Sequence, residues 1–291
     1  MFEEYCLYST TQSLYNIFES AMVDTSITLI FNKQPSGKFF IIGDNLEYQE
    51  ERAIVIKDDY VLNLKEINPI IEKIEKNQLL LDDVSEIWQG LIAYSGKDDP
   101  RIYSSNKKET PQHRKLLYGK DISKYTIDWS GEYLKYGEWL HRPRPAYIYD
   151  DEKILVQRIR NPQLAIRLVC TYDNEAYING TGLSNILIKH DLRDKYELKF
   201  ILGILWSPLI NYWFSYYFID VNIKPEQLRK IPLPSISKNE QNEIAILVNN
   251  ILDIKRLDAD KDVSKLEKEL NNKIYELYGL SAEEIAIVEG K

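Results

Sequence analysis

The C-terminal residues 238–291 carry the pattern that most constrains the fold. Apolar side chains recur there in two runs, from Ile244 to Leu252 and from Val263 to Leu277, at the spacing of amphipathic helices. Ser237 and Glu240 have the spacing of a capping box, so we expect the first helix to begin between them. A short acidic link separates the two runs. The sequence therefore predicts an antiparallel helical hairpin.

The preceding residues alternate between strand and helix signals. Ile154–Val156 predicts a buried strand, and β-branched residues predict further strands at Ala165–Tyr172 and Leu183–Ile188. Tyr196–Trp206 predicts a helix that breaks at Pro208 and resumes to about Phe218, with its aromatic residues mainly in the core. We therefore expect a mixed α/β (α+β) fold, in which a β-rich body is followed by the helical hairpin.

The N-terminal region has weaker signals. Ser26–Phe31 and Lys38–Ile42 are β-rich and flank a Gln-Pro-Ser-Gly turn, which predicts a hairpin. Ser13–Ala21 can form a short helix. Asn68 and Pro69 suit the cap and first position of another helix. We expect a first unit at residues 1–62, a body at 63–237 and the helical hairpin at 238–291.

Charge is unevenly distributed along the chain. The net charge of the whole is −8, but residues 97–170 hold 15 Lys/Arg against 10 Asp/Glu, whereas residues 1–96 hold 7 against 16. A basic middle between acidic ends indicates a localised anionic partner. Two distant cysteines and no signal-peptide core fit a reducing cytoplasm, and the most apolar run is too interrupted to predict a membrane span.

Four arginines lie on or beside stiff backbone. Arg142 and Arg144 flank Pro143, with Pro145 following, which predicts an extended exposed segment. Arg158 and Arg160 are two apart at the end of the Ile154–Val156 strand, so they point to the same side. Guanidinium groups held in this way suit phosphates and the guanine edge. The alternative is that these arginines pair with the nearby acids Asp150, Asp151 and Glu152.

Other chemistry has weaker support. Asp128, Asp151 and Lys153 could belong to a metal-dependent nuclease motif, which is one alternative function. The histidines lack metal-ligand spacing, and no glycine-rich phosphate loop is present, so we expect no metal and no catalytic residue on this chain. Asn161-Pro162-Gln163-Leu164 predicts a simple turn. A protein-interaction subunit that docks through its helices is the other alternative.

Several motifs occur in the order typical of one family. They are Leu117-Tyr118-Gly119-Lys120-Asp121-Ile122-Ser123-Lys124-Tyr125, Ile154-Leu155-Val156-Gln157-Arg158-Ile159, Leu202-Gly203-Ile204-Leu205-Trp206-Ser207-Pro208, Leu228-Arg229-Lys230-Ile231-Pro232-Leu233-Pro234 and Leu277-Tyr278-Gly279-Leu280. From Ile87 onward the chain thereby resembles the TaqI-like C-terminal specificity domain of type II restriction-modification enzymes. Residues 7–33 resemble the last elements of an N6-adenine DNA methyltransferase domain.

The resemblance implies sequence-specific recognition of double-stranded DNA, as the C-terminal portion of an adenine-specific methyltransferase or restriction enzyme. We then expect the bases to be read by Arg142, Arg144, Arg158 and Arg160, and the phosphates to be bound by Lys107, Lys108, Arg114, Lys115 and Lys120. S-adenosylmethionine would bind an upstream methyltransferase domain, covalently or non-covalently associated. We expect no cofactor on this chain and no catalytic activity from it alone.

Overall fold

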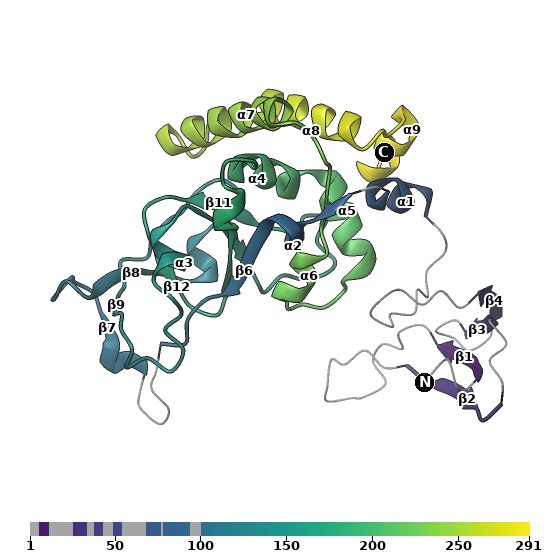
Figure 1. Cartoon of the computed structure of the whole chain (residues 1–291), viewed down its shortest axis with the longest axis horizontal. Helices are drawn as coiled ribbons and strands as arrows, with labels where there is room; N and C mark the ends of the chain where they lie inside the picture. Colours follow the sequence, from purple (N-terminus) through teal and green to yellow (C-terminus); the bar gives the residue numbers. More distant parts are fainter. Residues whose placement is uncertain are drawn as a thin grey trace. The chain divides into compact units, whose positions relative to one another are not determined.

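The computed structural model describes residues 6–11, 26–33, 38–42, 49–53, 68–76, 78–93 and 100–291. The chain divides into two compact units, Met1–Asn68 and Pro69–Lys291, and Figure 1 shows the elements of each. The boundary predicted after residue 62 and the short helix predicted at 13–21 lie outside the described residues.

The first unit contains a four-stranded sheet in the order β2-β1-β3-β4. Its strands are β1 (Cys6–Thr11), β2 (Thr28–Phe31), β3 (Lys38–Ile42) and β4 (Gln49–Ala53). The predicted hairpin of β2 with β3 is wrong, because β1 lies between them, antiparallel to β2 and parallel to β3. The serine and threonine residues of β1 gave no strand signal in the sequence. In the structure Ser9, Thr10 and Thr11 are buried, and the Thr10 and Thr28 hydroxyls are 3.0 Å apart.

The second unit contains the body and the C-terminal helices. Its strands are β5 (Leu79–Leu80), β6 (Ser85–Gln89), β7 (Ser104–Ser105), β8 (His113–Leu117), β9 (Tyr133–Lys135), β10 (Lys153–Gln157), β11 (Cys170–Asp173), β12 (Ile178–Asn179), β13 (Leu183–Ile188) and β14 (Pro232–Leu233). Its α-helices are α1 (Pro69–Glu75), α2 (Leu81–Val84), α3 (Tyr147–Asp150), α4 (Leu198–Trp206), α5 (Pro208–Tyr217), α6 (Pro225–Arg229), α7 (Lys238–Leu257), α8 (Ser264–Leu277) and α9 (Ala282–Val288). Short 3-10 helices lie at Pro100–Tyr103, Gly119–Asp121 and His190–Leu192.

A central antiparallel sheet, in the order β11-β10-β13-β6, is buried on both faces. Ile154 and Val156 of β10 point into a core shared with α4 and α5, whereas Leu155 points into a second core. Side chains alternate between the faces of a strand, so burial on both faces requires the continuous apolar run seen in the sequence. The strands predicted at Ile154–Val156 and Leu183–Ile188 are confirmed; the one predicted at Ala165–Tyr172 is shorter and begins at Cys170.

A second sheet, in the order β12-β8-β9-β7, joins the central sheet through a close backbone contact. Leu91 pairs with Gly180, and a side chain added at Gly90 would lie 2.2 Å from the Gly180 carbonyl oxygen. Glycine at position 90 therefore permits the two sheets to approach.

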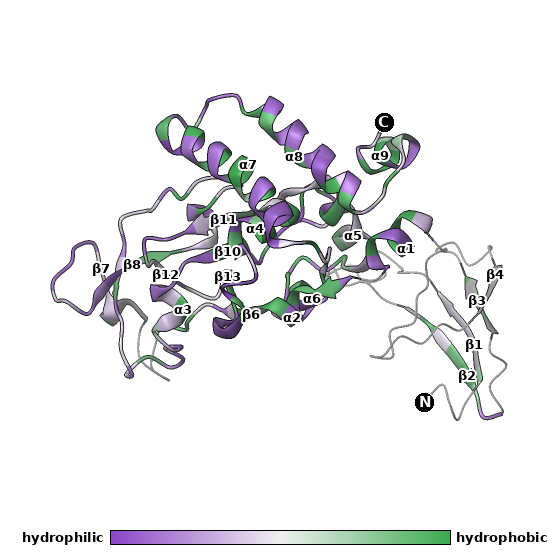
Figure 2. Cartoon of the chain, turned by 45° about the horizontal axis from the view of Figure 1, so that its top comes forward, coloured by the Kyte–Doolittle hydropathy of each residue, from purple (hydrophilic) through white to green (hydrophobic). Residues whose placement is uncertain are grey.

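α4 and the hairpin of α7 and α8 form two layers on one side of the central sheet. α4 contacts β10 and β11, and the hairpin of α7 and α8 covers α4 (Figure 1). Lys273 near the end of α8 is 2.8 Å from Glu243 near the start of α7, as in an antiparallel pair. Both helices alternate hydrophilic and hydrophobic residues along their length (Figure 2). The predicted hairpin and the capping box at Ser237 and Glu240 are confirmed.

The predicted break between α4 and α5 is confirmed. The Ser207 hydroxyl accepts a hydrogen bond from the Ile210 N–H at 3.2 Å, and Pro208 occupies the first turn of α5. Phe200, Trp206, Trp213 and Phe214 are buried, as the sequence predicted for these aromatics. Within the described residues, no helix combines the length and the apolar character that crossing a membrane requires.

Candidate nucleic-acid interface

Three strands of the central sheet place their connecting segments at one end. The register pairs Gln157 of β10 with Leu183 of β13, and Gln89 of β6 with Ser184 of β13. The segments that follow β6 and β10 therefore emerge beside the segment that precedes β13. We call this place the arginine end, and define it as residues 89–92, 119–120, 142–144, 157–160, 181–182 and 221–223.

Contacts with β6 bring Arg142 and Arg144 to the arginine end. The Ile92 N–H donates to the Arg142 carbonyl oxygen at 3.2 Å, and Arg144 Nε donates to the Gln89 carbonyl oxygen at 3.1 Å. The Arg142 side chain is exposed, and its backbone pairs with Ile92 in the extended form expected for the residue before Pro143. Arg142 thus presents an exposed side chain from a paired backbone.

Arg144 differs from the prediction. Its φ is +64°, in the left-handed region, although the residue before a proline was expected to be extended. Two contacts hold this conformation: the Tyr136 hydroxyl donates to the Arg144 carbonyl oxygen at 2.5 Å, and the guanidinium lies 5.9 Å from the centre of the Trp88 ring. The half-buried Arg144 side chain is packed against the body.

Arg158 is buried, with only 8% of its surface exposed. Its Nε donates to the Ile223 carbonyl oxygen at 3.1 Å, and its Nη1 donates to the Thr181 carbonyl oxygen at 2.7 Å. Burial also lowers the pKa of this guanidinium. Reading a base with Arg158 would require breaking both hydrogen bonds. The half-buried Arg160 donates from Nη2 to the Ile166 carbonyl oxygen at 3.0 Å.

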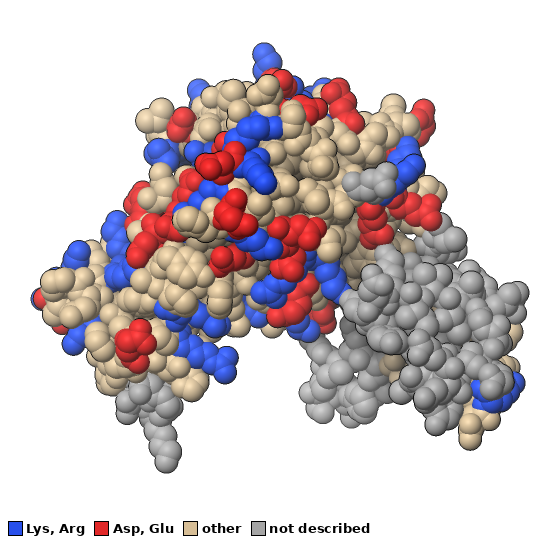
Figure 3. Space-filling view, viewed as in Figure 1, with Lys and Arg blue, Asp and Glu red and all other residues tan. Residues whose placement is uncertain are grey.

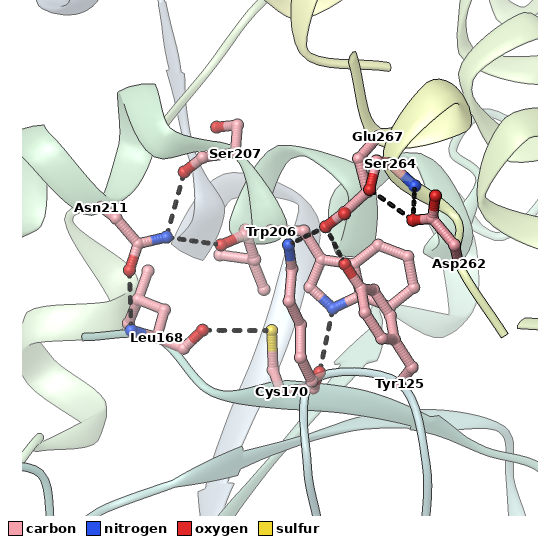
Figure 4. A network of polar contacts seen from close by, with 11 residues as sticks. Tyr125, Leu168, Cys170, Trp206, Ser207, Asn211, Asp262, Ser264 and Glu267 are labelled. Atoms are coloured by element: carbon pink, nitrogen blue, oxygen red, sulfur yellow. Dashed lines mark hydrogen bonds and ion pairs between the residues drawn. The ribbon is translucent and has the colours of Figure 1, made fainter. Parts of the chain in front are cut away.

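Arg167 belongs to the same framework, and sequence reasoning missed it. Its side chain is almost fully buried; Nη1 donates to the Phe218 carbonyl oxygen at 2.8 Å and Nη2 to the Asp220 carbonyl oxygen at 2.6 Å. The Asn211 side chain accepts from the N–H groups of Arg167 and Leu168, and Figure 4 shows the contact with Leu168. The feature of the sequence that could have indicated this polar network is Asn211, a polar residue within an apolar helix.

The expected phosphate-binding residues fall into two groups. Lys107, Lys108 and Lys120 are exposed. Arg114 instead forms a 2.8 Å ion pair with Asp150, and Lys115 lies 3.8 Å from Glu175 and near two aromatic rings. Asp150 and Asp151, the acids considered as partners of Arg142, Arg144, Arg158 and Arg160, pair instead with Arg114 and Arg193. On the face shown in Figure 3, basic side chains follow the lower left side and acidic ones gather nearer the middle.

The nuclease trio is not assembled. Lys153 is fully buried and forms a 2.7 Å ion pair with Asp173, and it also donates to the Tyr149 carbonyl oxygen. Asp151 pairs with Arg193, whereas Asp128 lines a separate hollow of about 410 Å³ beside α7. Burial lowers the pKa of Lys153, although Asp173 opposes this effect. Across the described ranges, no three metal-binding side chains gather into a group.

The turn predicted at Asn161–Leu164 is confirmed. The Gln163 N–H donates to Asn161 Oδ1 at 2.9 Å, and the Leu164 N–H donates to the Asn161 carbonyl oxygen at 3.2 Å. These bonds close a side-chain turn at the surface.

The Gly-Lys-Asp-Ile segment and Tyr125 have structural roles. The buried Asp121 carboxylate accepts the Tyr118 N–H at 2.7 Å, and the Gly119 carbonyl oxygen accepts Gln157 Nε2 at 2.7 Å. Tyr125 packs on Trp206, and its hydroxyl donates to Glu267 of α8, which also pairs with Lys124 at 2.7 Å (Figure 4). The motif thus shapes one loop of the arginine end and attaches the body to the helical hairpin.

Part of this chain matches a known protein family. The model of the TaqI-like C-terminal specificity domain matches residues 114–233. A curated protein of Methanocaldococcus jannaschii, "Putative type II restriction enzyme and methyltransferase RM.MjaORFECS2P", is 24% identical over 95% of this chain. The chain spans about a quarter of the length of that relative, since the match covers 24% of it.

A solved structure is similar in fold. The Type IIL restriction-modification enzyme MmeI, in complex with DNA, aligns with 99% of this chain and 45% of its own, at a TM-score of 0.60 and 10% identity. The family motifs, the mixed fold and the matched segment agree with one another. Residues 114–233 of this chain therefore match the family of TaqI-like C-terminal specificity domains.

Proposed function

We propose that this chain reads the sequence of double-stranded DNA for a restriction-modification enzyme. The observation that most strongly supports this proposal is the family match at residues 114–233, which includes most of the arginine end. The name of the M. jannaschii relative joins a restriction enzyme with a methyltransferase, and the MmeI structure contains DNA. Both support a role in DNA recognition beside a methyltransferase domain.

The structure supports a division of labour among the cations. Exposed Lys107, Lys108 and Lys120 are suited to phosphates, which fix the register of a protein on the duplex without reading sequence. Arg142 is the arginine best suited to reach a base edge, because its side chain is exposed while its backbone is paired. We assign Arg158 the role of supporting the arginine end from beneath. We propose that Arg114 and Lys115 contribute to the positive charge of the DNA-binding surface.

We propose further that the parent activity is N6-adenine methylation, with or without cleavage, and that S-adenosylmethionine binds a methyltransferase domain outside this chain. The chain would then hold DNA against that domain and catalyse nothing by itself. Isothermal titration of the chain with S-adenosylmethionine should give no binding heat, and methyl transfer above background would contradict this part of the proposal.

The test of sequence reading is selection from a pool of duplex DNA with a randomised central segment. The wild-type chain should enrich one motif over successive rounds, and its affinity for DNA should fall steeply as salt rises, because Lys and Arg contacts release counterions. A pool that stays random after selection, at low and at physiological salt, would reject the proposed function.

Two variants then separate reading from electrostatic attraction. Arg142→Ala should lower affinity for the enriched motif by about 1–3 kcal/mol and leave random DNA nearly unchanged. Lys108→Ala should weaken both DNAs alike and reduce the salt slope by about one unit. If Arg142→Ala weakens both DNAs equally, Arg142 contacts phosphate and the assignment of base reading to it is wrong.

A further inference from the structure

Two segments far apart in sequence form a short antiparallel ribbon at the arginine end. The Arg160 N–H donates to the Val221 carbonyl oxygen at 2.9 Å, and the Ile223 N–H donates to the Arg158 carbonyl oxygen at 2.6 Å. Ile159 and Asn222 face each other between these two bonds. In an antiparallel pair this is the non-hydrogen-bonded position, where the Cα atoms are about 4.5 Å apart and the side chains share one face.

The shared face of this ribbon points to solvent. Ile159 is 70% exposed, and Asn222 is exposed too; on the other face Arg158 and Ile223 are buried, although Val221 is 54% exposed. A single exposed isoleucine is ordinary on a protein surface, but Ile159 lies opposite an exposed amide on the same face of a paired ribbon. Ile159 also borders a hollow of about 340 Å³ with Gly119, Lys120, Gln157 and Gly182.

The ribbon is fixed from beneath by the two buried arginines. Arg158 donates to the Ile223 and Thr181 carbonyl oxygens, and Arg167 donates to the Phe218 and Asp220 carbonyl oxygens on the approach to the second strand. Each guanidinium makes two directed hydrogen bonds to backbone. The ribbon is therefore held in one conformation before any partner arrives, which reduces the entropy lost on binding.

Two exposed lysines lie near the ribbon and could contact the phosphates that flank a groove. Lys120 is exposed beside Ile159, and Lys224 follows the second strand. Lys224 lies 4.0 Å from Asp220, an exposed pair that contributes little energy. The chain near the ribbon thus offers an apolar group and an amide among charges of both signs, with Asp220 and Glu226 beside the two lysines.

We propose that the ribbon of residues 158–160 and 221–223 enters the major groove, and that Ile159 and Asn222 read an adenine–thymine base pair there. The major groove admits a two-stranded ribbon; asparagine pairs with the N6 and N7 atoms of adenine, and an apolar side chain contacts the thymine methyl group. This inference rests on the proposed function and names two specificity-determining residues in addition to Arg142.

The test uses the full chain and the same randomised duplex pool. Asn222→Ala and Ile159→Ala remove the two side chains, while Asn250→Ala and Ile246→Ala remove exposed counterparts on α7 as matched controls. Both ribbon variants should lose the preference for an adenine–thymine pair at the same position or at adjacent positions of the wild-type motif. Each should bind the wild-type motif about tenfold or more weakly, with random DNA unchanged within about twofold.

The controls should reproduce the wild-type motif and affinity. If both ribbon variants also enrich the unchanged wild-type motif, the ribbon does not read bases and the inference fails, while the proposed function stands. Equal weakening on every DNA would make the ribbon a backbone contact and would overturn the inference too. If the wild-type chain enriches no motif, the proposed function fails first and the inference fails with it.

Discussion

Two buried guanidinium groups connect the body to the segment 218–223. Arg158 and Arg167 each donate hydrogen bonds to two backbone carbonyl oxygens. The acceptors in these four bonds are backbone atoms and not carboxylate side chains. A buried carbonyl oxygen that loses its donor costs free energy comparable to a lost hydrogen bond. These arginines therefore act through the backbone that they hold.

At this scale we predict that Arg158→Leu lowers the free energy of unfolding by about 2–4 kcal/mol, since it leaves two carbonyl oxygens without their donor. Urea unfolding followed by tryptophan fluorescence measures the change. Arg142→Leu is the matched control, and the exposed position should keep its effect within about 0.5 kcal/mol. Equal stability of the two variants would show that Arg158 does not support the arginine end.

At the scale of elements, the helical hairpin is attached to the body through Glu267. The carboxylate accepts hydrogen bonds from Lys124 and Tyr125, and Tyr125 packs edge-on against Trp206 at 4.9 Å between ring centres. Burial by itself would raise the pKa of Glu267, but these hydrogen bonds and the Lys124 charge outweigh it, so the pKa lies below its usual value. The ionised carboxylate is the form that stabilises the attachment.

The sign of the pH dependence follows from this lowered pKa. Stability from Glu267 is fully present above its unfolded pKa of about 4.3, and is lost as pH falls through the lower folded value. We predict that Glu267→Gln lowers the free energy of unfolding by about 1–2 kcal/mol at pH 7. The difference from wild type should shrink as unfolding is measured at successively lower pH below about 4.3.

Glu243→Gln is the control for this prediction. Glu243 pairs with Lys273 in the same hairpin, but both side chains are exposed, so its loss should cost less than about 0.5 kcal/mol. A difference between wild type and Glu267→Gln that stays constant from pH 7 to pH 3 would contradict an attachment through the ionised carboxylate.

At the scale of the whole molecule, charge is divided between the two units. Residues 1–68 hold 5 Lys/Arg and 11 Asp/Glu, whereas residues 69–291 hold 32 and 34. The first and last helices of the second unit are joined, since Lys73 of α1 forms a 2.8 Å ion pair with Glu284 of α9. The second unit has its own core around α4, α5 and the central sheet.

We predict that a chain of residues 69–291 folds by itself and binds duplex DNA at least as tightly as the full chain at low salt. The reason is that it keeps the basic middle and loses a net charge of −6. Circular dichroism and DNA titration at two salt concentrations measure both properties. A folded 69–291 chain with much weaker DNA binding would assign part of the DNA contact to the first unit.

The sequence by itself determined the elements whose signals are local. The capping box at Ser237, the break at Pro208 and the apolar runs of β10 and β13 each depend on neighbouring residues, and each was predicted. The family motifs likewise predicted the specificity domain that the family match supports. Short-range hydrogen bonds and periodic burial are readable from sequence, because the partners are a few residues apart.

Only the tertiary structure decided which strands pair and which arginines are exposed. β1 inserts between β2 and β3 because long-range pairing has no local signal, and its buried threonines resemble loop residues in sequence. Arg142 and Arg158 look alike in sequence, yet one is exposed and the other is buried beneath a ribbon completed by residues 221–223. A guanidinium suits a phosphate, a base or a buried carbonyl oxygen equally well, so its role depends on the distant backbone that folding brings to it.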